Sequence, residues 1–176
     1  SFGGKKGFKV TYWNNPDLSG NPVTTVQITN PIKMTTAGQH EFASGVKLEG
    51  FSALFEAEFT PKVSEELVFK GGATGYFELI VDGKTIQTYN NWRTLSSRIP
   101  VKVEAGKKYK IEIKYAQKND WQANIELDFG REMDVDYTKL LEKLKGIETV
   151  VFVGGLSGNL EGEEMPVNYP GFKGGD

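Results

Sequence analysis

Apolar and polar residues alternate in short runs along most of the chain, most clearly in its middle third. Residues 51–59 alternate without interruption, and residues 77–81 follow the same period of two. Because successive side chains of a strand point to opposite faces of a sheet, this period predicts strands with one buried face. Asp82-Gly83 separates the second run from another β-favouring run at residues 85–89. An Asp-Gly pair supplies the positive φ angles of a type I′ turn, so residues 75–92 are predicted to form a β-hairpin.

Further short runs with the same alternation occur before and after this hairpin. They are residues 8–12, 99–103, 109–115 and 123–129, while residues 23–28 and 67–70 are predicted as short strands without this alternation. Turn-forming residues separate most of them, for example Asn14-Asn15-Pro16 and Glu104-Ala105-Gly106. Residues 30–45 are irregular, and the sequence predicts no element there. About eight short strands, each polar on one face, predict a mainly β protein with an antiparallel β-sandwich or barrel.

Beyond residue 131 the apolar spacing becomes that of an amphipathic helix. The residues at positions i, i+3, i+4 and i+7 are apolar, namely Tyr137, Leu140, Leu141 and Leu144. Asp136 precedes them as a candidate N-cap, and Gly146 follows them as a candidate C′ residue. The near-continuous apolar run at residues 149–153 is typical of a parallel strand that is covered on both faces. The last residues, 154–176, are rich in glycine and show no periodicity.

A helix followed by one such strand is half of an α/β unit, and this chain offers it no parallel sheet to join. We therefore predict two regions. Residues 1–131 form the β-sandwich, and residues 132–176 form a fragment of an α/β domain with a helix, a strand and a glycine-rich loop. The chain begins at Ser1 without Met, so we expect a segment cut from a longer protein, whose targeting signals this sequence does not reveal.

The charge balance and the missing cysteines argue against several functions. The 21 basic and 23 acidic residues leave a net charge of −2 and form no basic stripe, which argues against nucleic-acid binding. No apolar run approaches the ~20 residues of a membrane span. Without cysteine there is no thiolate metal site and no cysteine nucleophile. His40 is the single histidine, and Asp134-Val135-Asp136 lacks the glycine and the terminal glutamate of a calcium loop. We therefore expect no metal and no cofactor.

Aromatic and amide side chains gather next to the predicted strand ends. Such side chains suit sugars, because aromatic rings stack on pyranose faces while amides and carboxylates bind hydroxyl groups. Trp92 is alternatively a core residue, since large aromatic side chains are mostly buried. Trp121 follows a polar run and is expected to be exposed, whereas the role of Trp13 stays open. The candidate sugar contacts are Tyr89, Asn91, Trp92, Arg93, Asp120 and Trp121.

The predicted hairpin also carries a family signature. Asp82-Gly83-Lys84 followed by Asn91-Trp92 resembles the β-hairpin signature of the anthrax-protective-antigen-type (PA14) domain. This resemblance implies a β-sandwich that is associated with carbohydrates. Adhesin members of the family bind sugar through a calcium ion held by an Asp-Asp pair. No such pair occurs in this chain, which argues against calcium-dependent sugar binding.

The C-terminal segment carries a second resemblance. TVVFVGGLSGNLEGEEMPVNYPGFKGGD is similar to the opening strand and catalytic loop of the C-terminal α/β domain of glycoside hydrolase family 3, which includes β-glucosidases and β-xylosidases. Several of those enzymes carry a PA14 domain inserted into that α/β domain, so the two resemblances agree in their order along the chain. The second resemblance implies that Glu161 is the catalytic acid/base of a retaining hydrolase, with Glu163 and Glu164 as alternatives. The family nucleophile is an Asp in a separate N-terminal barrel, so the isolated chain is not expected to be active.

Together the resemblances imply an accessory domain of a family 3 glycosidase. Such a domain shapes the access of substrate to an active site that cleaves β-glucosides or β-xylosides. The expected partners are an oligosaccharide or glycoside and the remaining catalytic domains, with no nucleic acid and no membrane. The parent enzyme is expected to be periplasmic or extracellular. Two alternatives stay open: a stand-alone sugar-binding module, and a structural or dimerisation spacer without a ligand.

Overall fold

The computed structural model describes residues 6–29, 31–91, 97–118, 122–133, 136–149 and 151, together with the backbone of residues 167–169 and 172–174. The chain divides into two compact units, Ser1–Met133 and Asp134–Asp176.

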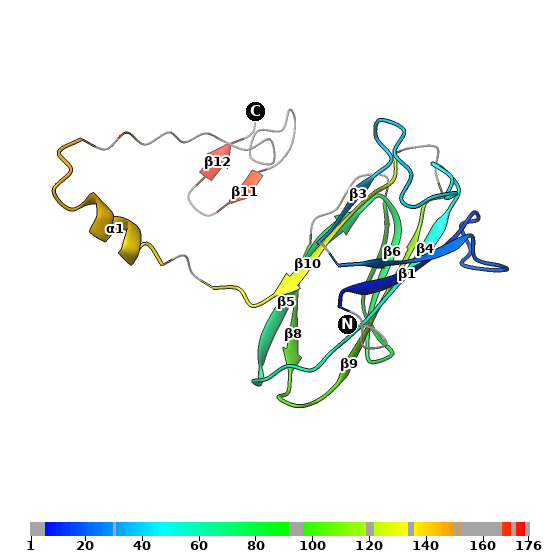
Figure 1. Ribbon diagram of the computed structural model, residues 1–176, viewed down its shortest axis with the longest axis horizontal. Coiled ribbons are helices and arrows are strands. Elements are labelled where there is room, and N and C mark those ends of the chain that lie inside the picture. Colours follow the sequence, from blue (N-terminus) through cyan, green and yellow to red (C-terminus); the bar gives the residue numbers. More distant parts are fainter. Residues whose placement is uncertain are drawn as a thin grey trace. The chain divides into compact units, whose positions relative to one another are not determined.

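Within the described part of the first unit, ten strands form two antiparallel sheets (Figure 1). The larger sheet has six strands in the order β2-β1-β4-β9-β6-β7. They are β2 (Thr24–Ile28), β1 (Phe8–Trp13), β4 (Ser52–Phe59), β9 (Tyr109–Ala116), β6 (Gly75–Val81) and β7 (Lys84–Asn91). The smaller sheet has the order β3-β10-β5-β8. Its strands are β3 (Ile32–Thr35), β10 (Asn124–Gly130), β5 (Glu65–Ala73) and β8 (Ser97–Val103).

The core lies between the two sheets, because alternate side chains of both point inward. Burying one large apolar side chain stabilises the fold by roughly 1.5–3 kcal/mol. Phe42 closes the core beside Phe51 and Tyr115, with ring centroids 5.0 Å and 6.1 Å from its own. The largest fully buried apolar side chains come from both sheets: Tyr12, Tyr115, Phe51, Phe55, Phe69, Phe77, Leu79, Ile111, Ile113, Ile125 and Val10. The prediction of a mainly β, antiparallel sandwich is confirmed.

The predicted hairpin of β6 and β7 is also confirmed. Asp82 and Gly83 have φ angles of 51° and 74°, as a type I′ turn requires, and Val81 pairs with Lys84 across the turn. A β-bulge after Leu79 shifts the register of the remaining pairs.

Two parts of the smaller sheet differ from the sequence prediction. The segment at residues 30–45, for which no element is predicted, contains β3 at the edge of the sheet. Ile32 and Met34 alternate with Lys33 and Thr35, but a run of four residues is too short to distinguish a strand from an irregular segment. The strand predicted at residues 67–70 extends over the whole of β5, because Gly71 continues to pair with β10 and does not end the strand. A Cβ atom added at Gly71 would lie 2.3 Å from the carbonyl oxygen of Glu126, so this glycine marks a close approach of two strands.

In the second unit, helix α1 spans Thr138–Leu144 and begins one residue later than predicted, with Tyr137 at the N-cap position. Asp136 still contributes to the cap, since its carboxylate accepts a hydrogen bond from the Thr138 amide at 2.9 Å. Hydrogen bonding to the Thr138 side chain, followed by this bond to its amide, holds the pKa of Asp136 below its usual range. Gly146 follows the C-cap with a φ of 80°, which confirms its predicted role.

The end of the second unit also differs from the prediction. β11 (Val167–Tyr169) and β12 (Phe172–Gly174) pair as antiparallel strands within the segment that shows no periodicity in the sequence. The strand predicted at residues 149–153 lies mostly outside the described residues. Thr149 and Val151 are described, and neither lies in a strand.

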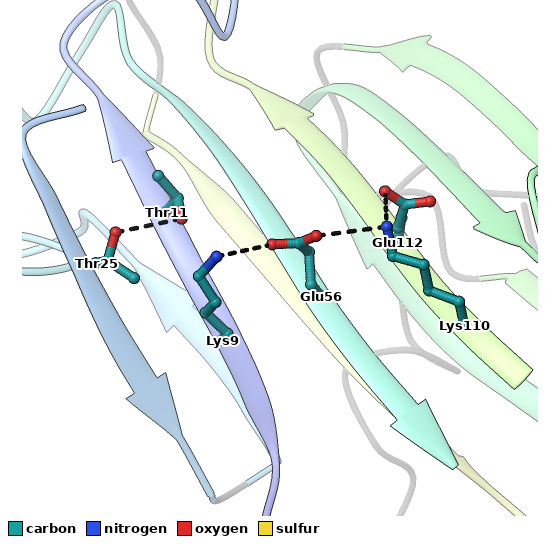
Figure 2. A network of polar contacts seen from close by, with 6 residues as sticks. All are labelled: Lys9, Thr11, Thr25, Glu56, Lys110 and Glu112. Carbon is teal, nitrogen blue, oxygen red and sulfur yellow. Dashed lines mark hydrogen bonds and ion pairs between the residues drawn. The ribbon is translucent and has the colours of Figure 1, made fainter. Parts of the chain in front are cut away.

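Charged side chains of opposite sign link neighbouring strands on the outer face of the six-stranded sheet (Figure 2). Glu56 and Glu112 stand directly opposite each other on β4 and β9, an unfavourable pairing of like charges. The Lys110 ammonium offsets it, because it lies 3.5 Å from the Glu56 carboxylate and 2.8 Å from that of Glu112 (Figure 2). Lys9 reaches Glu56 from the other side at 3.3 Å. These acidic positions therefore have a structural explanation that requires no ligand.

Ion pairs fasten the last residues of the first unit onto the four-stranded sheet. Arg131 pairs with Glu65 on β5. Glu132 pairs with Lys70 on β5 at 2.6 Å and with Arg98 on β8. These side chains are about half exposed, so each pair contributes little to stability and the cluster mainly fixes the course of the chain.

The Arg98 and Lys70 cations hold the pKa of Glu132 at about 2. Because the folded pKa lies below the ordinary value of 4.5, the ionised carboxylate favours the folded arrangement at and above that pH. We expect this contribution to disappear as the pH falls from 4.5 towards 2. Carboxyl ¹³C NMR should place the Glu132 midpoint well below 4, and Lys70→Gln should raise it. A midpoint near 4.5 in the unmodified protein would show that the cluster does not form in solution.

Candidate functional site

Five strands of the six-stranded sheet begin or end at the same end of the sheet. We call it the loop end and define it by the terminal strand residues Trp13, Ser52, Gly75, Asn91 and Ala116. Trp13 pairs with Ser52, Ser52 with Ala116, and Gly75 with Asn91, while β6 and β9 are neighbours. Trp13 ends β1, and the segments that follow β7 and β9 carry the other two tryptophans. The loop end therefore unites the starting points of all three tryptophan-bearing segments.

Gly75 permits the close approach of strands at the loop end. Its φ is 90°, and an added Cβ would lie 2.5 Å from the carbonyl oxygen of Ala116. β6 and β9 therefore meet here at a distance that no side chain at this position would allow. On its other side Gly75 pairs with Asn91, the last residue of β7. The segments that follow β7 and β9 therefore begin on the two sides of Gly75.

Two buried threonines of the first unit fix the chain where it returns after residue 121. The Thr74 hydroxyl donates to the Gln122 carbonyl and accepts from the Asn124 amide, both at 2.9 Å. The Thr36 hydroxyl accepts from the Ala123 amide at 2.9 Å. Because buried polar groups are costly without partners, these bonds hold residues 122–124 in one conformation.

Trp13 and Asn14 serve the structure of their own loops. The indole N–H of Trp13 donates to the Gly20 carbonyl at 3.1 Å. The Asn14 amide donates to the Gly45 carbonyl at 3.0 Å, and its oxygen accepts from the Lys47 amide at 2.8 Å. The question left open for Trp13 thus has a structural answer, since its polar atom is used within the loop.

Of the predicted sugar contacts, Tyr89 and Asn91 fall within the described residues, both on β7. The Tyr89 ring stacks on Phe77 with centroids 5.0 Å apart and packs against the core. Burial raises the pKa of its hydroxyl to about 12. One face of this ring is therefore used in packing. Asn91 is half-buried and is the last residue of the strand. The other predicted site residues lie outside the described residues: Trp92, Arg93, Asp120, Trp121, Glu161, Glu163 and Glu164.

Sequence reasoning missed Tyr76, a half-buried ring on the outer face of β6 at the loop end. Its hydroxyl donates to the Glu78 carboxylate at 3.0 Å, and the Lys118 ammonium lies 5.7 Å from its ring centroid. A hydrogen bond from Thr85, followed by bonds from Lys114 and Tyr76, holds the pKa of Glu78 below its usual range. An aromatic ring beside fixed polar groups suits the faces and hydroxyls of a sugar. The signal in the sequence was an aromatic residue at a polar position of an alternating run.

A metal site or a membrane-spanning helix would place specific requirements on the described residues. No three His, Cys, Asp or Glu side chains among them gather closely enough to hold a metal ion. The same part of the chain includes no helix with the length and apolarity needed to cross a membrane.

The sequence has clear relatives. Residues 4–143 match the PA14 domain family. Over 173 residues, or 98% of the chain, the sequence is 46% identical to a xylan 1,4-beta-xylosidase from Xylanibacter ruminicola. The chain spans 20% of the length of that enzyme.

Solved structures share the fold at much lower identity. An anti-sigma factor domain-containing protein from Clostridium clariflavum superposes with a TM-score of 0.60 and 24% identity over 74% of this chain and 44% of that chain. A beta-glucosidase from Kluyveromyces marxianus in complex with glucose superposes with a TM-score of 0.56 and 12% identity over 73% of this chain and 16% of that chain. The Epithelial Adhesin 9 A domain from Candida glabrata in complex with Galb1-3GlcNAc superposes with a TM-score of 0.53 and 10% identity over 72% of this chain and 82% of that chain. At these identities the likeness concerns the fold alone.

Proposed function

The chain belongs to the PA14 domain family, and from this premise we propose that it is the accessory domain of a family 3 glycoside hydrolase that cleaves β-xylosides or β-glucosides. Its 46% identity to a xylan 1,4-beta-xylosidase over almost the whole chain supports this proposal. So does the small share of that enzyme that the chain spans, since an accessory domain is expected to be a minor part of a longer protein. We place the parent enzyme in the periplasm or outside the cell, as the family resemblance implies.

The role we propose for the domain is to shape the access of oligosaccharides to the active site of the parent enzyme. The convergence of five strand ends at the loop end carries this proposal. Loops on a rigid scaffold are common carriers of recognition, because the scaffold fixes where they begin and end. Here Gly75 and the two buried threonines supply that rigidity. The segments that contain Trp92 and Trp121 start from this scaffold and are the parts we expect to meet substrate.

We expect Trp92→Ala and Trp121→Ala in the full-length parent enzyme to lower kcat/KM for xylotetraose by about two- to twelvefold, because one lost aromatic contact costs roughly 0.5–1.5 kcal/mol. The same variants should leave kcat/KM for nitrophenyl xyloside nearly unchanged, since that short substrate does not extend to an accessory domain. Steady-state kinetics on the two substrates measures the difference.

Trp13→Phe is the matched control, because it keeps an aromatic ring at the loop end and Trp13 already has a structural partner. Its kinetics should match the unmodified enzyme on both substrates. Equal losses on the long and the short substrate would point to a folding defect. Unchanged kinetics for both tryptophan variants would favour the spacer alternative.

An independent sugar-binding module is the second candidate function, and the Tyr76 ring favours it. In that case the isolated chain binds xylo- or cello-oligosaccharides without the catalytic domains. Such a shallow contact gives dissociation constants on the order of millimolar. Chemical-shift titration that moves the amides of Tyr76, Asn91 and Lys118 distinguishes this module from a domain that only restricts access.

A further inference from the structure

Two adjoining hollows lie on the four-stranded sheet, away from the loop end. They have volumes of about 140 Å³ and 230 Å³, and Lys70 and Asp128 line both of them. These two residues are exposed and stand directly opposite each other on β5 and β10. The hollows are therefore two halves of one depression on the outer face of the sheet, here called the trough.

A missing side chain opens the smaller half of the trough. Gly130 lines the smaller hollow, and a Cβ atom added there would meet nothing within 4 Å. Gly71 lines the larger hollow with its backbone, since a Cβ atom there would meet Glu126 and Leu127 of β10. Val68 lines the smaller hollow and gives it an apolar floor, whereas the Phe129 ring packs on Phe69 in the core. The trough thus combines an apolar surface with open space above the strands.

The charges around the trough are arranged so that one carboxylate stays open. Lys70 directs its ammonium to Glu132 at 2.6 Å and not to Asp128, although Asp128 is its direct strand partner. Glu126 pairs with Lys33 at 3.6 Å. Among the residues that the structure describes, Asp128 has no ion-pair partner within 4 Å. Its carboxylate therefore faces both hollows as a free hydrogen-bond acceptor.

The lining as a whole is electrically balanced. It holds three cations and three anions: Lys33, Lys70, Arg131, Glu126, Asp128 and Glu132. A strongly charged ligand such as a phosphate would meet repulsion from one half of this set. A neutral ligand with many hydroxyl groups is favoured, because each hydroxyl both donates and accepts and so matches neighbouring carboxylates and ammonium groups.

We propose that the trough is a binding site for a neutral oligosaccharide, separate from the loop end. Asp128 accepts hydrogen bonds from two neighbouring hydroxyls of one sugar ring, and the Lys70 ammonium donates to an adjacent oxygen. Val68 contacts the apolar face of the ring. Each hollow is smaller than the roughly 300–1,000 Å³ of drug-sized pockets, so the trough takes one or two sugar rings with dissociation constants on the order of millimolar. This site does not depend on the proposed function, because it shares no residue with the loop end.

The test is an amide chemical-shift titration of the full 176-residue chain with xylotetraose and with cellotetraose. We expect saturable shifts at Lys70, Gly71, Asp128 and Gly130. Asp128→Asn should weaken binding at least fivefold, because a carboxylate accepts hydroxyl hydrogen bonds about twice as strongly as a neutral oxygen. Gly130→Leu should abolish the shifts at the other three residues by filling the smaller hollow.

Glu66→Gln is the matched control, since Glu66 is an exposed carboxylate on β5 that does not line the trough. It should bind as the unmodified chain does. The proposal is overturned if neither oligosaccharide shifts the trough residues, or if Gly130→Leu binds normally while remaining folded. Shifts confined to Asn91 and Lys118 would also overturn it while leaving the proposed function intact.

Discussion

Replacing Gly71 by alanine is expected to destabilise the sandwich by about 4 kcal/mol or more, which places it among the most damaging single substitutions. The added Cβ would lie 2.3 Å from the Glu126 carbonyl oxygen and 3.2 Å from the Cα and Cδ1 atoms of Leu127. The nearest atom belongs to the backbone of a paired strand, so no side-chain rotation relieves the overlap. β5 and β10 must separate locally, which breaks ladder hydrogen bonds between the two central strands of the smaller sheet. Urea denaturation followed by tryptophan fluorescence measures the loss.

Gly130→Ala is the control for this substitution. Gly130 lies on the neighbouring strand, and a Cβ atom there meets open space. Alanine also restricts the unfolded chain, so we expect a change within about 1 kcal/mol of zero or a slight stabilisation. Similar urea midpoints for the two variants would show that β5 and β10 do not approach each other as closely as the structure indicates.

The comparison of these glycines shows where sequence reasoning succeeds and where it stops. The period of two at residues 51–59 and 77–81 identifies strands because each needs one buried face. The Asp82-Gly83 pair identifies its turn because the turn needs a positive φ at two successive residues, and few residue types other than Asn, Asp and Gly adopt a positive φ. The strand predicted at residues 67–70 stops before Gly71, yet the real strand continues through it, because the reason for glycine there is a backbone atom on β10. That atom is more than fifty residues away and leaves no local signal.

The candidate site shows the same limit. The sequence places each tryptophan beside polar residues near a predicted strand end. Only the strand register reveals that β1, β7 and β9 all end at the loop end. Tyr89 is directly opposite Phe77, so its ring stacks there and packs against the core. Tyr76, one position along β6, points to the other face. Counting residues from the turn does not predict which of the two tyrosine rings faces the core, because a bulge shifts the strand pairing inside the hairpin.

The largest effect on activity is expected at Glu161, which we propose as the general acid/base of the parent enzyme. This assignment comes from the family 3 resemblance of residues 149–176, and the residue lies outside the described part of the chain. A retaining glycosidase needs one protonated carboxylic acid beside the leaving oxygen. Burial and a nearby nucleophile carboxylate raise the pKa of such an acid, so that it remains protonated near neutral pH. By the same resemblance the nucleophile belongs to a separate barrel of the parent enzyme, so the role we propose for Glu161 requires that barrel.

In the full-length parent enzyme, Glu161→Gln is expected to lower kcat/KM for xylobiose by about 10²–10⁴-fold, the contribution of a positioned general acid. Activated aryl xylosides should lose far less, because a good leaving group departs without a proton. Added azide should restore part of the rate on those substrates, since it attacks the glycosyl-enzyme intermediate without help from a general base. Glu163→Gln and Glu164→Gln are the matched controls and should leave the ratio between the two substrates unchanged. If Glu161→Gln cleaves xylobiose at a near-normal rate and one of the other two variants shows the azide response, the acid/base assignment moves to that glutamate.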